Sequence, residues 1–111
     1  STLFPYTTLF RSETLEQDVA LQVRRAWLDF QSAQEQLANA EAQLRAAEQA
    51  LQAAQDRYEA GASTLVELTQ ARATQVQAAS ALVSARYNLQ FQRILIDYYT
   101  GDLDPVRLAA E

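Results

Sequence analysis

The side chains in this 111-residue sequence that could do chemistry are mainly carboxylates, because 14 residues are Asp or Glu and none is His or Cys. The missing types exclude a thiol nucleophile, a His general base and a Cys/His zinc site. Glu35, Glu41, Glu48 and Asp56 spread around the polar surface of a helical stretch, which is typical of a solvated face. We therefore expect no enzyme activity, no cofactor and no metal site.

Charge and hydropathy argue against two further classes, nucleic-acid-binding proteins and proteins with membrane-spanning helices. The net charge is −5, all 9 basic residues are Arg, and no basic stripe is present, so nucleic acid is not an expected partner. The longest compact apolar cluster is Ile94-Leu95-Ile96. A membrane-spanning helix needs about 18 to 20 apolar residues in a row, and no run approaches that length.

The turn around Gly61 is the one segment for which a functional role, docking of a partner, competes with a structural role, capping of the helices. Gly61 ends a long helical pattern, where its left-handed conformation would cap the helix. Ser63 and Thr64 are candidate N-caps of a second helix, and Glu67 completes a capping box with Thr64. The same exposed turn, with small Ala62 and Ser63, could dock the helices of a partner. Spacing alone favours the capping role.

The elements that position this turn are two long helices. Ala supplies 21 residues and Gln 14, against 2 Gly and 2 Pro, a composition typical of helices. Residues 33–60 form four heptads that place a large residue and an Ala on one seam, as in a coiled coil. The seam consists of Ala33, Leu37, Ala40, Leu44, Ala47, Leu51, Ala54 and Tyr58.

Each helix also carries a second apolar stripe, so a single hairpin cannot bury them all. On the first helix the second stripe is Ala42, Ala46, Ala53 and Ala60. The two stripes of the second helix are Leu65, Leu68, Ala79, Leu82 and Leu89, and Val66, Ala73, Val76, Val83, Tyr87 and Ile94. We expect partner helices on both flanks, although Ala is also a good helix former at surface positions.

The sequence thus predicts an all-α fold, a long antiparallel, coiled-coil-like helical hairpin over residues 13–111. The expected parts are a helix at about 14–60, a tip at 61–63, a helix at about 64–99 and a short segment at 100–111, where Asp104-Pro105 begins a terminal helix. Residues 1–12 differ from the rest, and residues 2–12 look like the translation of a sequencing adapter. We expect a non-native leader, followed by a fragment of a longer protein.

The stretch Y-E-A-G-A-S-T-L-V-E-L-T-Q-A, residues 58–71, resembles the tip signature of TolC-like outer-membrane channel proteins. A-R-Y-N-L at 85–89 and Y-T-G-D-L at 99–103 are similar to later segments of that family. The resemblance covers nearly everything from Glu13 onward. It implies the hairpin of an α-barrel wall in the periplasm, within a homotrimeric outer-membrane channel for efflux or type I secretion. A periplasmic adaptor and, indirectly, an inner-membrane pump would be its partners.

The resemblance also implies roles for individual residues at the tip. Tyr58, Gly61, Ala62, Ser63 and Thr64 would form the adaptor-docking tip. In such members a Tyr matching Tyr58 helps to hold the entrance closed, and an acid matching Glu67 lines it, so that a carboxylate ring favours cations. Two positions depart from the pattern. Ser63 stands where such members place an Arg, and Gln70, also at the entrance, stands where they place a second acid.

Two other interpretations stay open on the sequence. A periplasmic adaptor hairpin is also a helical hairpin, but its tip usually carries an Arg/Leu/Ser pattern, whereas this tip reads Y-x-x-G. An unrelated oligomeric coiled-coil scaffold predicts one seam per helix instead of two.

Overall fold

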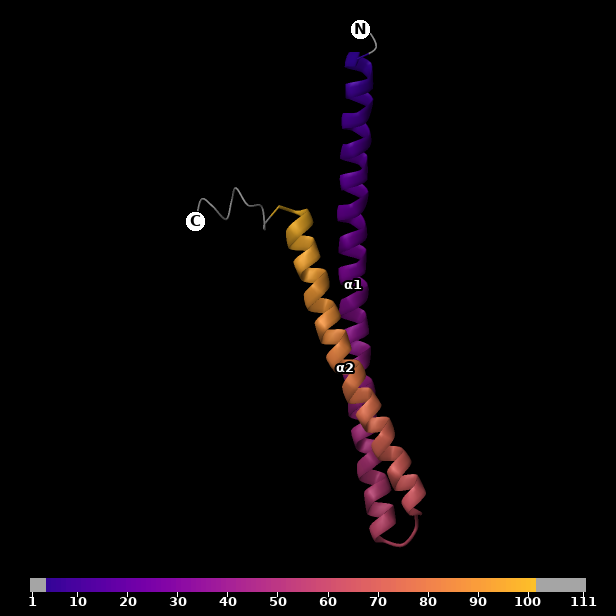
Figure 1. Cartoon of the computed structure of the whole chain (residues 1–111). Coiled ribbons are helices and arrows are strands. Elements are labelled where there is room, and N and C mark those ends of the chain that lie inside the picture. Colours follow the sequence, from indigo (N-terminus) through magenta and orange to yellow (C-terminus); the bar gives the residue numbers. More distant parts are fainter. Residues whose placement is uncertain (1–3, 102–111) are drawn as a thin grey trace. The chain divides into compact units, whose positions relative to one another are not determined.

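The computed structural model describes residues 4–101 and contains two helices in that range. Helix α1 runs over Phe4–Glu59 and helix α2 over Leu65–Tyr99 (Figure 1). The described part of the chain holds no strand, which confirms the predicted all-α class. No helix within it is apolar over a stretch long enough to span a membrane.

Helix α1 begins about ten residues before the predicted start, at Phe4 instead of about residue 14. Pro5 lies in the first turn, where its fixed φ suits a helix and its missing N–H would have no partner. Extending a formed helix costs far less than nucleating one, so the strongly helical residues that follow favour this continuation. The predicted helix at Asp104-Pro105 lies outside the described residues.

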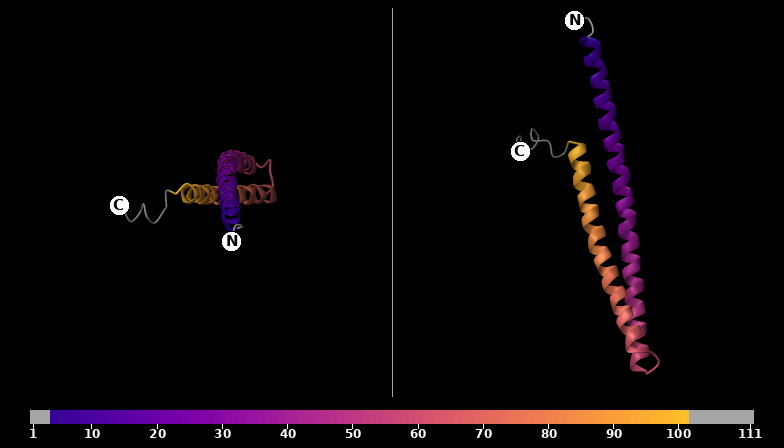
Figure 2. Two further views of the ribbon diagram at one scale, coloured as in Figure 1. Left: turned by 90° about the horizontal axis from the view of Figure 1, so that it is seen from above. Right: turned by 45° about the vertical axis from the view of Figure 1, so that its right-hand side comes forward.

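The chain divides into two compact units, and residues 32–90 form the unit that we call the tip hairpin. Within it α1 and α2 run antiparallel, side by side, and are joined by the turn at residues 60–64 (Figure 2). This arrangement confirms the predicted coiled-coil-like hairpin for these residues.

The predicted seam of α1 is the one that packs inside the tip hairpin. Ala33 is only 1% exposed, Ala40 and Ala47 are also buried, and the intervening Leu37, Leu44 and Leu51 are half-buried. Small residues at every second seam position allow the helix backbones to approach more closely than a zipper filled with Leu would.

The seam of α2 contains most of the predicted stripe, because Leu68 and Leu82 are buried and Ala79 and Leu89 are half-buried. The other half-buried residues of α2 in the tip hairpin are Ala71, Gln75, Ala78, Ala85 and Asn88. Leu65, which we expected in this stripe, is 60% exposed. Gln75 takes a seam position although it is polar, because the neighbouring seam residues fix the heptad register.

Among the described residues, the other unit contains 4–31 and 91–101. Ala26 and Ile96 are its buried apolar residues among those described. The Trp27 and Phe30 rings meet edge to face, with centroids 6.1 Å apart, although Trp27 is 49% exposed. Tyr98 and Tyr99 form a similar pair at 5.6 Å.

Candidate interaction site

The turn of the tip hairpin is fixed first by the end of α1. Gly61 has φ +76°, the left-handed conformation predicted from its position. Its N–H donates to the Tyr58 carbonyl at 3.0 Å, and the Ala62 N–H donates to the Arg57 carbonyl at 2.8 Å. These two hydrogen bonds form a Schellman motif, which satisfies carbonyls that the helix end would otherwise leave unpaired.

The start of α2 is fixed by Thr64, which is the N-cap. Its Oγ1 accepts a hydrogen bond from the Glu67 N–H at 3.2 Å, and its carbonyl accepts one from Leu68 N–H at 3.2 Å. This confirms the predicted N-cap and half of the capping box. The Glu67 carboxylate makes a different contact from the predicted one, because it accepts a hydrogen bond from Ser63 Oγ at 2.6 Å.

A charge pair connects the two helix ends. Arg57 in the last turn of α1 places Nη2 3.6 Å from Glu67 Oε2 in the first turn of α2. Each charge also suits the dipole of its own helix, since Arg stands at a C-terminus and Glu at an N-terminus. The side chains are 61% and 54% exposed, so solvent weakens the ion pair. Sequence reasoning missed Arg57, because only the turn brings it to Glu67.

The predicted tip residues do gather at this turn. Tyr58 and Ala62 are exposed, and Ser63 is half-buried beside Glu67. Gln70 lies one turn further along α2, where it lines a shallow hollow with Leu65, Val66, Thr69 and Ala73. The structure thus presents Tyr58 and Ala62 to solvent, whereas the Glu67 carboxylate is engaged by its own hairpin.

One flank of the tip hairpin carries two shallow hollows between α1 and α2 that share Gln43 and Ala81. Every lining residue is small or carries an uncharged polar side chain: Gln36, Asn39, Ala40, Gln43, Ala46, Ala47, Ala50, Thr74, Gln77, Ala78, Ala81, Ser84, Ala85 and Asn88. The sequence signal for this groove is the recurrence of small residues beside the seam, some of which belong to the predicted second stripe of α1. In the part of the chain that the structure describes, no group of acids is placed to hold a metal ion.

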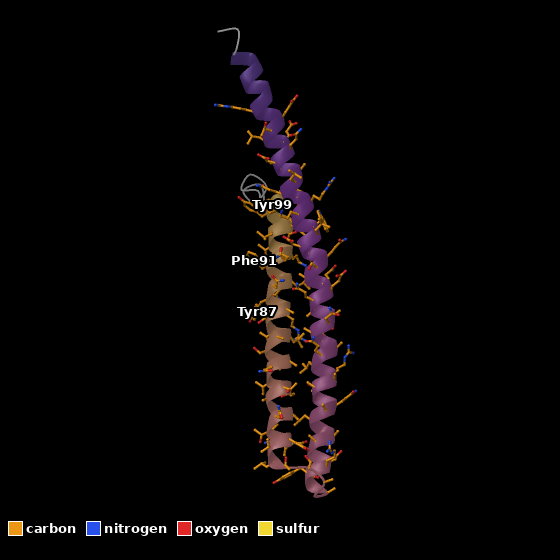
Figure 3. All side chains as sticks on the ribbon, turned by 90° about the vertical axis from the view of Figure 1, so that its right-hand side faces the viewer. Tyr87, Phe91 and Tyr99 are labelled. Atoms are coloured by element: carbon orange, nitrogen blue, oxygen red, sulfur yellow. The ribbon has the colours of Figure 1, made fainter. Side chains whose placement is uncertain are left out.

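The second apolar stripes remain uncovered in the tip hairpin. The alanine stripe of α1, defined by Ala42, Ala46, Ala53 and Ala60, is exposed throughout. The valine stripe of α2, defined by Val66, Ala73, Val76, Val83 and Tyr87, is also exposed, from 49% at Val83 to 73% at Val66 among its large residues. Tyr87 lies on the side of α2 that faces away from α1 (Figure 3). In the tip hairpin each helix thus buries most of one apolar stripe and exposes the other.

The fold and its uncovered stripes define a class of long antiparallel helical hairpin that exposes a second apolar stripe on each helix. A family model described as outer membrane efflux protein matches residues 9–102, so the chain belongs to the outer membrane efflux protein family. The resemblance to TolC-like channels is therefore confirmed at the level of the family. No curated protein and no solved structure matches the chain.

Proposed function

We propose that the chain forms part of the wall of a trimeric outer-membrane channel, which acts as a passive exit duct for efflux or type I secretion. Its hairpin lies in the periplasm and carries no catalytic step, because an inner-membrane pump supplies the energy. Family membership supports the channel over an adaptor hairpin or an unrelated scaffold. The observation that carries the proposal is the exposed second stripe on each helix, which a duct wall would cover.

The tip is the proposed contact for a periplasmic adaptor. Its exposed Tyr58 and Ala62 form a surface that another helical hairpin can approach, and the capping hydrogen bonds of Gly61 and Thr64 fix the backbone there. Glu67 and Gln70 follow on α2, where we place the entrance of the duct. Because Arg57 and Ser63 engage Glu67, a ring of such carboxylates would attract cations less than free carboxylates would.

A hairpin exchange tests the proposed function. Residues 32–90 would replace the corresponding hairpin of an outer-membrane efflux protein from the same family, and export of a fluorescent substrate would be measured in cells. We expect export together with normal amounts of trimer in the outer membrane. A chimera that reaches the outer membrane as a trimer but fails to export, even with the adaptor matched to its tip, would contradict the proposal.

A matched pair of variants in the chimera separates docking from folding. Ala62→Trp enlarges the exposed tip without touching the capping hydrogen bonds of Gly61, whereas Gln52→Trp enlarges an exposed position on α1 before the turn. We expect Ala62→Trp to reduce export at an unchanged trimer level, and Gln52→Trp to leave export near that of the parent chimera.

A further inference from the structure

The flank of the tip hairpin that carries the two shallow hollows has no charged side chain in their lining. Ten of residues 32–90 are Asp, Glu or Arg, and none of them lines either hollow. The polar groups of this lining are amides and hydroxyls, such as those of Gln43 on α1 and Ser84 on α2. We call this surface the neutral flank, and it is defined by the residues that line the two hollows.

Most of the charges in this range lie on the opposite flank of the hairpin. Residues two positions apart on an α-helix point in directions that differ by about 200°. Glu41 and Arg45 each lie two positions from Gln43 of the neutral flank, and Arg72 lies two positions from Thr74. The other members recur at helical spacing on the same faces, and together they form the charged flank: Glu41, Arg45, Glu48, Asp56, Glu59, Arg72 and Arg86.

The face of α2 that belongs to the neutral flank continues to the turn. Gln70 lies four positions before Thr74 and seven before Gln77, so it shares their face of the helix. The other residues that line the hollow beside Gln70 are uncharged as well: Leu65, Val66, Thr69 and Ala73. The charged residue on this face is Glu67, at the start of α2, where Arg57 pairs with its carboxylate. The uncharged surface therefore extends along the tip hairpin as far as the proposed entrance.

A surface of this kind suits the path of a solute. Fixed charges of one sign concentrate solutes of the opposite sign and exclude those of the same sign, whereas amides and hydroxyls hold water without such selection. We propose that the neutral flank lines the duct, so that this segment passes solutes of either charge, and that the charged flank faces the periplasm. The inference rests on the proposed function and deepens it, because it names the surface that solutes meet and the class of solute that this surface admits.

Thiol modification of the hairpin-exchange chimera tests the assignment, because the chain contains no Cys and a Cys-free host can be used. Gln43→Cys places a thiol on the neutral flank. Gln52→Cys is the matched control, since it replaces an exposed Gln of the same helix between Glu48 and Asp56 of the charged flank. Currents through trimers in planar bilayers would be recorded before and after a cationic or an anionic methanethiosulfonate. We expect the two reagents to shift the K⁺/Cl⁻ permeability ratio of Gln43→Cys severalfold in opposite directions and to leave that of Gln52→Cys unchanged.

Export in cells tests the class of solute. Gln43→Glu should lower export of an anionic fluorescent substrate severalfold relative to a cationic one, Gln43→Arg should do the reverse, and Gln52→Glu should keep the ratio of the parent chimera.

The alternatives give different results. A response of Gln52→Cys instead of Gln43→Cys would overturn the proposal, because the charged flank would then line the duct. Labelling of Gln43→Cys without any change in current would also overturn it, since the neutral flank would then lie outside, where a partner helix could cover it. If Gln43→Cys gives no response while the chimera exports, only the flank assignment fails. If it responds as expected while the chimera does not export, only the export function fails.

Discussion

Glu67 Oε2 lies 3.6 Å from Arg57 Nη2 and accepts a hydrogen bond from Ser63 at 2.6 Å. One carboxylate oxygen therefore contacts both the last turn of α1 and the turn between the helices. Glu67 itself belongs to the first turn of α2, so its side chain connects the two helix ends. The hydrogen bond from a neutral hydroxyl to a charged acceptor is of the stronger kind, whereas the exposed ion pair is weak. The contact network orients the turn more than it stabilises the fold.

Replacement of the Glu67 carboxylate by an amide measures how much these contacts contribute to the stability of the fold. We expect Glu67→Gln to lower the free energy of unfolding of the chain by about 0.5–1 kcal/mol, since it removes the ion pair and weakens one charge-assisted hydrogen bond. Urea titration followed by circular dichroism checks this, with the exposed Glu48→Gln as a control of equal charge change. A loss above about 2 kcal/mol would show that Glu67 is a main determinant of stability.

The backbone of the turn should be more sensitive than its charges. A Cβ at Gly61 would meet nothing within 4 Å, so the cost of Gly61→Ala comes from φ +76° alone. We expect a loss of about 1–2 kcal/mol in urea titration. Gly61→Asn should lose less, because Asn adopts the left-handed region more readily than Ala does. Equal losses for the two variants would contradict a cost set by φ.

The sequence predicted the bounds of α2 better than those of α1, but it predicted the buried face of α1 more completely, and this second difference has a physical reason. On α1 every seam position is Ala, Leu or Tyr, so apolar spacing alone identifies the buried face. On α2 the seam contains Gln75 and several Ala beside its Leu residues, and the exposed stripe is apolar as well. Apolar spacing alone therefore separates the buried face of α2 from its exposed face less clearly. The contact of Glu67 with Arg57 joins two residues that are ten positions apart in the sequence. It depends on the path of the turn, which no local sequence pattern reveals.

The polar seam residue Gln75 offers a direct test of the observed register. It is half-buried, so Gln75→Leu should add apolar burial at the seam and raise the free energy of unfolding by up to about 1 kcal/mol. The exposed Gln77→Leu should change it by less than about 0.5 kcal/mol. Thermal melting of both variants checks the difference. If Gln77→Leu stabilised the chain more than Gln75→Leu did, the result would contradict the observed register, because the buried face of α2 would then contain Gln77.

Two adjacent residues of α2 separate folding from association. Leu82 is buried in the seam, whereas Val83 is 49% exposed on the valine stripe. We expect Leu82→Ala to cost at least about 2 kcal/mol in dilute solution, where removal of a buried side chain leaves a cavity. In the same dilute solution, Val83→Ala should change the free energy of unfolding by less than about 0.5 kcal/mol relative to the parent.

Self-association should depend on the exposed Val83, in contrast to folding, which depends more on the buried Leu82. In sedimentation equilibrium at increasing concentration, Val83→Ala should shift association to higher concentrations, because it removes a large side chain from the exposed valine stripe. Since association stabilises the folded chain by mass action, the parent should gain melting temperature with concentration and Val83→Ala should gain less. Equal association of Val83→Ala and the parent would contradict a contact through the valine stripe.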